Sequence, residues 1–268
     1  MKIALIFLSL RRTMLALVFS PRSTAISLVV LAAALAIVAC GGDDGASDGG
    51  QSLPQDGDQV DLDPADFTTQ IDNPWWPMEP GARWVYRETD QEGSVQRDVV
   101  TVTDKTKRIA NGVEARVVHD VATEDGEPIE ITDDWYAQDS DGKIWYLGED
   151  TAEYENGKVA TRAGSFEAGV GGAQAGVIMP ADPQVGQSYR QEYYKGHAED
   201  EAKNLSLDEQ VGVPFGHFTG VLETAESNPL EPKVDEHKFF AKGVGPVLAL
   251  TLSGGSDREE LLSYTEGK

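Results

Sequence analysis

The sequence predicts an all-β fold: an antiparallel meander of about ten long strands, curled into a half-barrel or barrel, with little helix. Regularly spaced Asn-Gly and Asp-Gly pairs supply the positive φ that tight hairpin turns need. The segments between them are rich in β-formers and lack a helical period. About ten long strands are too many for a flat open sheet. The pairs are Asn111-Gly112, Asp125-Gly126, Asp141-Gly142 and Asn156-Gly157.

The strands fall into two groups, separated by a Gly/Pro-rich break at 164–186. The first group is predicted at 83–89, 95–103, 113–123, 129–138 and 143–148. The second group is predicted at 188–200, 204–214, 217–227, 234–243 and 246–254. Near the C-terminus, Ser256 and Glu259 have capping-box spacing, which predicts one helical turn there.

Residues 1–39 are predicted to be a signal peptide. Their only charges are Lys2, Arg11, Arg12 and Arg22, and an apolar stretch at 25–39 follows. This stretch is too short for a comfortable membrane span of about 20 residues. Met14 is an alternative start to Met1, because Arg22 would still precede the apolar stretch.

The single cysteine of the chain, Cys40, ends the apolar stretch. The tetrapeptide Ile37-Val38-Ala39-Cys40 resembles the lipobox of bacterial lipoproteins. The resemblance implies that Cys40 carries diacylglycerol and becomes the mature N-terminus, anchored in the bilayer on the extracytoplasmic face of the cell membrane. The alternative is a buried or free cysteine at the end of a membrane helix.

Composition divides the rest of the chain in two. Residues 40–65 are mostly Gly, Asp, Ser and Gln, which predicts a flexible acidic tether after the lipidated Cys40. Aromatic residues then begin at Phe67, which predicts a single all-β extracytoplasmic domain over 66–268.

The net charge restricts the partners. Removal of the leader takes away four basic residues and no acidic ones. The formal charge therefore changes from −24 for the full chain to −28 for the mature chain. Such a surface argues against nucleic acid as a partner and against adsorption to anionic headgroups. A simply well-solvated surface is the alternative to a specific cation function.

Three stretches of the sequence resemble recurring signatures of an uncharacterised group of bacterial lipoproteins. They are "NPWWPMEPGARWVY", "VGVPFGHF" and "KFFAKGVGPV". Their order is also similar to that of LolA- and LppX-like β-sheet proteins. The second resemblance implies a curved sheet around a hydrophobic cavity that carries lipid or another apolar envelope molecule. Neither resemblance implies catalytic residues or a cofactor.

Four aromatic residues are the candidate ligand-binding residues. Trp84 and Tyr86 have the period-two spacing that faces both inward, and Trp135 and Trp145 flank the Asp141-Gly142 turn on strands that can pair. Aromatic residues inside a curled sheet either fill it or line an apolar cavity. The sequence leaves both alternatives open.

Histidine and carboxylate residues form the candidate metal site. His197 would share a strand face with Glu199, and Asp235 would share one with His237. Such groups can ligate zinc or manganese, although neither spacing is a recognised motif. A solvated surface is the alternative.

The predicted function is a membrane-anchored, non-catalytic binding protein for an apolar or envelope ligand. It would have no cofactor and no nucleic-acid partner. Two alternatives remain: a metal-dependent hydrolase using a His/carboxylate cluster, and a purely structural or interaction domain.

Overall fold

A computed structural model describes residues 53–268, and the leader, the lipobox and Cys40 lie outside the described residues. The predicted all-β antiparallel fold is confirmed. Every strand pair is antiparallel, and one 3-10 turn, η1 (Pro64–Asp66), precedes the strands. The strands are β1 (Phe67–Thr68), β2 (Arg83–Thr89), β3 (Val95–Arg108), β4 (Glu114–Glu124), β5 (Glu127–Asp139), β6 (Ile144–Glu155), β7 (Lys158–Thr161), β8 (Phe166–Glu167), β9 (Gln174–Met179), β10 (Ser188–Arg190), β11 (Glu192–Tyr193), β12 (Glu201–Val213), β13 (Gly216–Ser227), β14 (Asp235–Ala241), β15 (Gly245–Ser253) and β16 (Arg258–Thr265).

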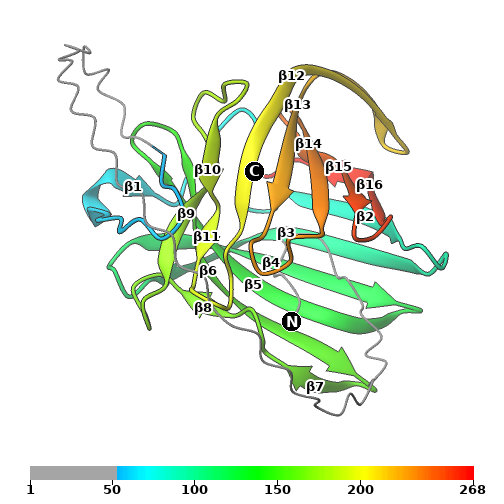
Figure 1. Ribbon diagram of the computed structural model, residues 1–268, viewed down its shortest axis with the longest axis horizontal. Helices are drawn as coiled ribbons and strands as arrows, with labels where there is room; N and C mark the ends of the chain where they lie inside the picture. The colour runs from blue at the N-terminus through cyan, green and yellow to red at the C-terminus, as the bar shows by residue number, and fades with distance from the viewer. Residues whose placement is uncertain (1–52) are drawn as a thin grey trace, which may run out of the picture. The chain divides into compact units, whose positions relative to one another are not determined.

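The sheet curls into a nearly closed barrel of thirteen strands. In Figure 1 the green strands β3 to β6 form one wall, and the yellow to red strands β12 to β16 form the other. The path begins at β10 and ends at β11, two strands that are adjacent along the chain. One short segment therefore joins the two ends of the sheet.

Gly176 lies where the two ends of the sheet meet. A Cβ on Gly176 would lie 2.2 Å from the carbonyl of Gln191, between β10 and β11. The backbone N–H of Gln191 in turn donates to the carbonyl of Asp200, just before β12, at 2.7 Å. Only glycine permits so close an approach of two backbones, so the side-chain-free position of β9 is what lets the barrel close here.

The hairpin turns form where the Asn-Gly and Asp-Gly pairs predict them. Asp125 and Asn156 have φ of 52°, and the glycine after each also has positive φ. Positive φ at both central residues gives a turn whose twist matches that of the flanking strands. The dipeptides therefore set the register of β4 with β5 and of β6 with β7.

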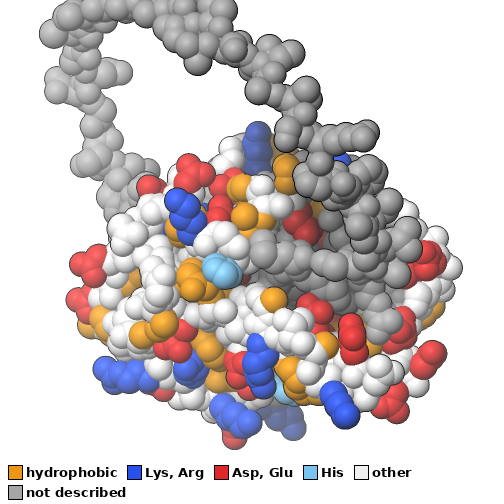
Figure 2. Space-filling model, turned by 60° about the horizontal axis from the view of Figure 1, so that its bottom comes forward, with side chains coloured by type: hydrophobic (Ala, Val, Ile, Leu, Met, Phe, Trp, Pro, Cys, Tyr) orange, Lys and Arg blue, Asp and Glu red, His pale blue; other side chains and the backbone are white. Residues whose placement is uncertain are grey.

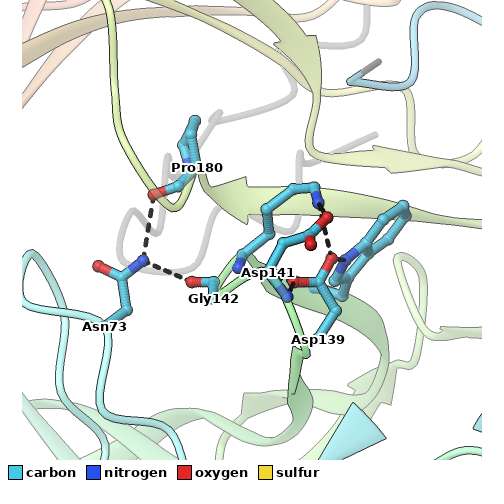
Figure 3. A network of polar contacts seen from close by, with 7 residues as sticks. Asn73, Asp139, Asp141, Gly142 and Pro180 are labelled. Carbon is cyan, nitrogen blue, oxygen red and sulfur yellow. Dashed lines mark hydrogen bonds and ion pairs between the residues drawn. The ribbon is translucent and has the colours of Figure 1, made fainter. Parts of the chain in front are cut away.

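The turn at Asp141-Gly142 is also a hairpin, and Asp139 holds it together (Figure 3). The Asp139 carboxylate accepts hydrogen bonds from the backbone N–H of Asp141 and Lys143 and from the Trp145 indole, at 2.8–3.1 Å. Asn73, at the start of the Pro-rich segment 73–80, reaches the same turn and donates to the carbonyls of Gly142 and Pro180. This segment is thereby fixed across one end of β5 and β6.

The sheet packs on both of its faces. The interior cluster includes Trp76, Trp84, Tyr136, Phe240 and Leu261. The outer cluster, on the opposite face of β4, β5, β6 and β9, includes Trp135, Trp145, Leu147, Val177 and Tyr189, and Leu53, Val60 and Phe67 pack against it. Strands buried on two faces cannot show simple polar and apolar alternation.

One prediction needs correction. The helical turn expected near Ser256 and Glu259 is instead β16, whose pairing with β2 closes the meander.

Residues 53–65 pack on the barrel from Leu53 onward. The Arg190 guanidinium donates to the carbonyls of Asp56 and Asp58 at 2.6 and 2.8 Å. These bonds fix a segment that its composition assigned to the tether.

Over residues 53–268, no helix has both the length and the apolar character needed to cross a membrane.

Candidate functional site

Nine carboxyl side chains of the barrel strands, together with Asp200 just before β12, form a continuous belt, which we call the carboxyl ring. Nine of them are at most 6% exposed, and Asp120 is partly buried. Each member is close enough to the next to be influenced by its charge, all the way round. In order around the barrel, the ring is Glu88, Asp98, Asp120, Asp134, Glu149, Glu192, Asp200, Glu226, Glu236 and Glu259.

Strand periodicity and register place these side chains on the interior face. On β2, Glu88 shares its face with Tyr86 and Trp84, because alternate residues point the same way. Glu88 lies directly opposite Glu259 of β16, which shares a face with Leu261. The same alternation joins Asp98 to Val100 on β3. The interior therefore has two layers. One is the carboxyl ring, and the other is the apolar interior cluster, which begins two residues away along β2, β3 and β16.

On β6 a register irregularity serves the same arrangement. Asp134 pairs with Glu149, whereas Tyr136 pairs with Tyr146, so β6 has an extra residue between these two pairs. Gly148 lies in that interval with φ of 127°, a conformation that favours glycine. The bulge brings Glu149 beside Asp134 while keeping Tyr146 against Tyr136, with ring centroids 5.1 Å apart.

Burial is the largest cause of the raised pKa values in the ring. It raises the pKa of Glu88 to about 9, and the charges of Asp257 and Asp98 add to the effect. Burial also raises the pKa of Asp134, Asp200 and Glu236 to about 7 each. The pKa values of Asp120, Glu149, Glu192 and Glu259 are raised well above their ordinary range by burial and by neighbouring carboxylates. Like charges in a site of low polarity cannot all ionise together, so the ring holds protons at neutral pH.

Two pairs of neighbouring carboxyls in the ring shift each other's pKa in opposite directions. Asp120 lowers the pKa of Asp98, whereas Asp98 raises the pKa of Asp120. Glu192 lowers the pKa of Asp200, whereas Asp200 raises the pKa of Glu192. Each pair therefore titrates as a unit, because the two carboxyls interact too strongly to ionise independently.

Among residues 53–268, Lys238 is the one Lys or Arg that forms an ion pair with the ring. Its ammonium lies 2.6 Å from Glu226 and 3.5 Å from Glu236, and its side chain is 5% exposed. Burial lowers the pKa of Lys238, but Glu226 and Glu236 outweigh this and raise it above its ordinary value. One permanent cation thus lies among ten carboxyls. The outer surface differs, because on the face in Figure 2 Lys and Arg side chains are interspersed with Asp and Glu.

Three uncharged polar groups on the interior face have no hydrogen-bond partner. They are the Gln96 amide oxygen, the Thr251 hydroxyl and the Tyr136 hydroxyl, on residues at most 5% exposed. Gln96 shares its face with Asp98, Thr251 lies opposite Glu236, and Tyr136 shares its face with Asp134. Buried polar groups are nearly always hydrogen-bonded in folded proteins. Within residues 53–268, these three groups are exceptions to that rule on the interior face.

The four predicted aromatic residues do not form one lining. Trp84 and Tyr86 face the interior, where their N–H and O–H donate to the carbonyls of Val244 and Pro246 at 2.7 and 2.9 Å. Trp135 and Trp145 belong to the outer cluster. Trp135 and Trp145 do lie on paired strands, β5 and β6, as their positions on either side of one turn predicted. Their side chains, however, lie on the opposite face of the sheet from Trp84 and Tyr86.

The predicted metal residues are not brought together into a site. Over residues 53–268, no group of three or more His, Cys, Asp or Glu side chains is arranged to hold a metal ion. His197 stacks on Tyr194, and Glu199 accepts a hydrogen bond from the backbone N–H of Gly196. His237 contacts Glu223 at 2.7 Å, and Asp235 lies farther off at 3.8 Å.

The carboxyl ring was not predicted from the sequence. In a chain with 46 Asp and Glu residues, adjacent carboxylates carry almost no information. A usable signal was present in "RWVYRE", where Glu88 falls on the same strand face as the aromatic Trp84 and Tyr86. An acidic residue on a face otherwise assigned to the core is unusual unless it has a partner or a function.

Comparisons with known proteins add little. No protein-family model matches the chain, and no curated protein matches it. One solved structure, a protein from Parabacteroides distasonis described as a "putative lipoprotein", is similar over 71% of this chain and 98% of its own, with 13% sequence identity and a TM-score of 0.40. A similarity of this size carries no argument about function.

Proposed function

We propose that this chain is a lipid-anchored, extracytoplasmic binding protein that receives its ligand inside the barrel and catalyses no reaction. The observation that carries the proposal is the carboxyl ring, with three unpartnered polar groups on the same interior face. A packed core of this size would be expected to hold apolar side chains at these positions. Retaining ten carboxyls there is costly, and a bound partner would offset the cost.

The ring alters the expected nature of the ligand. An apolar ligand could contact the interior cluster, but the ring beside it would lose hydration without gaining hydrogen bonds. The metal-dependent hydrolase has less support, since His237 is bonded to Glu223 and His197 is stacked on Tyr194. A purely structural domain remains the competing outcome of the experiments below.

The anchor is tested by Cys40→Ser. We expect the variant to lose incorporation of radiolabelled fatty acid and to leave the membrane fraction, because the lipobox resemblance makes Cys40 the acylated residue. The measurement is label incorporation together with fractionation of cells that express the full chain. Equal labelling of the wild type and Cys40→Ser would show that the anchor is elsewhere.

The binding site is tested by mass spectrometry of small molecules that co-purify with the full chain. We expect a stoichiometric small molecule with the wild type and a clearly smaller amount with the double variant Glu88→Gln/Glu259→Gln, because both substitutions are in the ring. The double variant Glu155→Gln/Asp208→Asn changes two exposed carboxyls and is the matched control. Equal recovery from all three proteins would place the site outside the ring.

A further inference from the structure

We propose that the ligand of the carboxyl ring is an organic polycation of the linear polyamine class, with several N–H donors on one flexible chain. The inference rests on the proposed function and specifies the chemistry of its ligand.

The balance of charge calls for cations. Ten carboxyls face inward, and the ammonium of Lys238 forms ion pairs with two of them, Glu226 and Glu236. Within residues 53–268, no Lys or Arg forms an ion pair with the other carboxyls of the ring. A ligand that carries several positive charges would replace protons as the partner of these carboxyls.

The available hydrogen-bonding groups match amines. Gln96 offers an amide oxygen without a donor, and Glu259 has a carboxyl oxygen in the same condition. Each protonated amine supplies two or three N–H donors, which suits a surface made of acceptors. The methylene groups between the amines need apolar contact, and the interior cluster next to the ring provides it through residues such as Tyr136, Tyr146 and Phe240. Aromatic faces also attract ammonium groups.

The distribution of the carboxyls favours an extended ligand over a metal ion. The ring takes its members from strands all around the barrel, so the carboxylates face one another across the interior instead of converging on one point. Calcium and magnesium need six or more oxygen ligands at about 2.0–2.6 Å from one centre. Within residues 53–268, no group of three or more His, Cys, Asp or Glu side chains converges on such a centre. A flexible chain with spaced charges can contact several carboxylates at once.

Binding should be linked to proton release. The groups that face one another in the interior are the ten ring carboxyls, together with Lys238, Glu130, Asp257 and the hydroxyls of Tyr86, Tyr136 and Tyr146. At neutral pH several ring carboxyls are protonated, and a cation favours their ionised form. Each carboxyl that ionises on binding releases one proton, so affinity should rise with pH while the amines remain charged.

The experiment is a calorimetric titration of the full chain, reconstituted in nanodiscs of uncharged lipid, with spermidine at physiological ionic strength. Repeating it in buffers of different ionisation enthalpy counts the protons released. We expect saturable binding of one spermidine with net proton release, and affinity that increases between about pH 5 and about pH 8. Glu88→Gln/Glu259→Gln should weaken binding by about ten- to a hundredfold, the usual loss for charge-assisted hydrogen bonds. It should also release fewer protons.

Controls separate the ring from diffuse attraction by the acidic surface. Glu155→Gln/Asp208→Asn removes the same charge from exposed positions and should leave both affinity and proton count unchanged. Equal weakening by the two double variants would overturn the inference, because the attraction would then be a surface effect. So would calcium binding that competes with spermidine at equal affinity.

A fluorescent fatty acid, corrected for its partition into empty nanodiscs, distinguishes the inference from the function on which it rests. Saturable fatty-acid binding without spermidine binding would leave a barrel-interior binding protein but refute the polyamine class. If neither probe binds, and nothing co-purifies with the chain, both the inference and the proposed function fail. Spermidine binding with proton release supports both.

Discussion

Lowering the pH from about 8 to about 5 is expected to stabilise the barrel. The cause is the carboxyl ring, whose members keep protons in the folded state that they lose on unfolding. For each proton that only the folded state keeps, the free energy of unfolding falls by about 1.4 kcal/mol for every unit by which the pH rises. The measurement is thermal unfolding of the full chain across this pH range.

The direction follows from the raised pKa values. Below its ordinary value of 4.5, Glu88 is protonated in both the folded and unfolded states, and its full contribution to stability is present. As the pH rises from there to about 9, the unfolded state releases the proton first, and stability is lost through that window. Asp134, Asp200 and Glu236 act in the same sense up to about 7. Glu260 acts oppositely, because its salt bridges lower its pKa, so stability should fall again in stronger acid.

Glu88→Gln isolates the ring from the general effect of net charge. The substitution removes one buried titrating group, so the pH slope should become shallower by about 1.4 kcal/mol per pH unit between about pH 5 and about pH 8. At the upper end the variant should be more stable than the wild type, by on the order of 3 kcal/mol. The exposed substitution Glu155→Gln is the control and should change neither the slope nor the midpoint. A steeper slope, or a less stable Glu88→Gln at high pH, would contradict the account.

Lys238→Met is expected to destabilise the barrel strongly near pH 8, by about 3–5 kcal/mol. The substitution keeps much of the volume of the side chain but removes the ammonium between Glu226 and Glu236, leaving buried carboxylates without a cation. Near pH 5 the loss should be smaller, because Glu236, whose pKa is about 7, is then protonated. Chemical unfolding at the two pH values measures the difference.

A second substitution separates lost charge from lost packing. Lys238→Met/Glu226→Gln removes both members of the 2.6 Å ion pair and should recover most of the stability at high pH. Lys203→Met, at an exposed position of β12, is the control and should be close to neutral. If the double variant is as unstable as Lys238→Met alone, the contribution of Lys238 lies in packing rather than charge.

The strands and turns could be predicted because their signals are local. Asn156-Gly157 and Asp125-Gly126 require positive φ wherever they occur, and hairpins follow from that requirement. The region from Arg258 to Thr265 was harder, because its fate depends on pairing with β2, which lies far away in the sequence. The same holds for residues 53–65. Their composition is typical of a tether, yet Arg190 and the outer cluster bind the segment in place.

The site was much less predictable than the fold. The face on which Trp84 and Tyr86 lie was correct, but the sequence does not reveal that Glu88 continues that face into a closed ring. Strands such as β5 are buried on both sides, so Trp135 and Tyr136 are both in cores, and their alternation does not tell inside from outside. Only the closure of the barrel brings Glu192 and Asp200 beside carboxyls from the first half of the chain.

The central claim is that carboxyls of the ring stay protonated at neutral pH. Infrared difference spectroscopy tests it most directly, because protonated and ionised carboxyls absorb at different frequencies. The spectrum of the wild type minus that of Glu88→Gln, recorded on the full chain across a pH series, isolates one buried carboxyl. The account predicts a protonated-carboxyl band that persists at neutral pH and disappears near pH 9, the pKa of Glu88. A band that is already lost near the ordinary carboxyl value of 4.5 would contradict it.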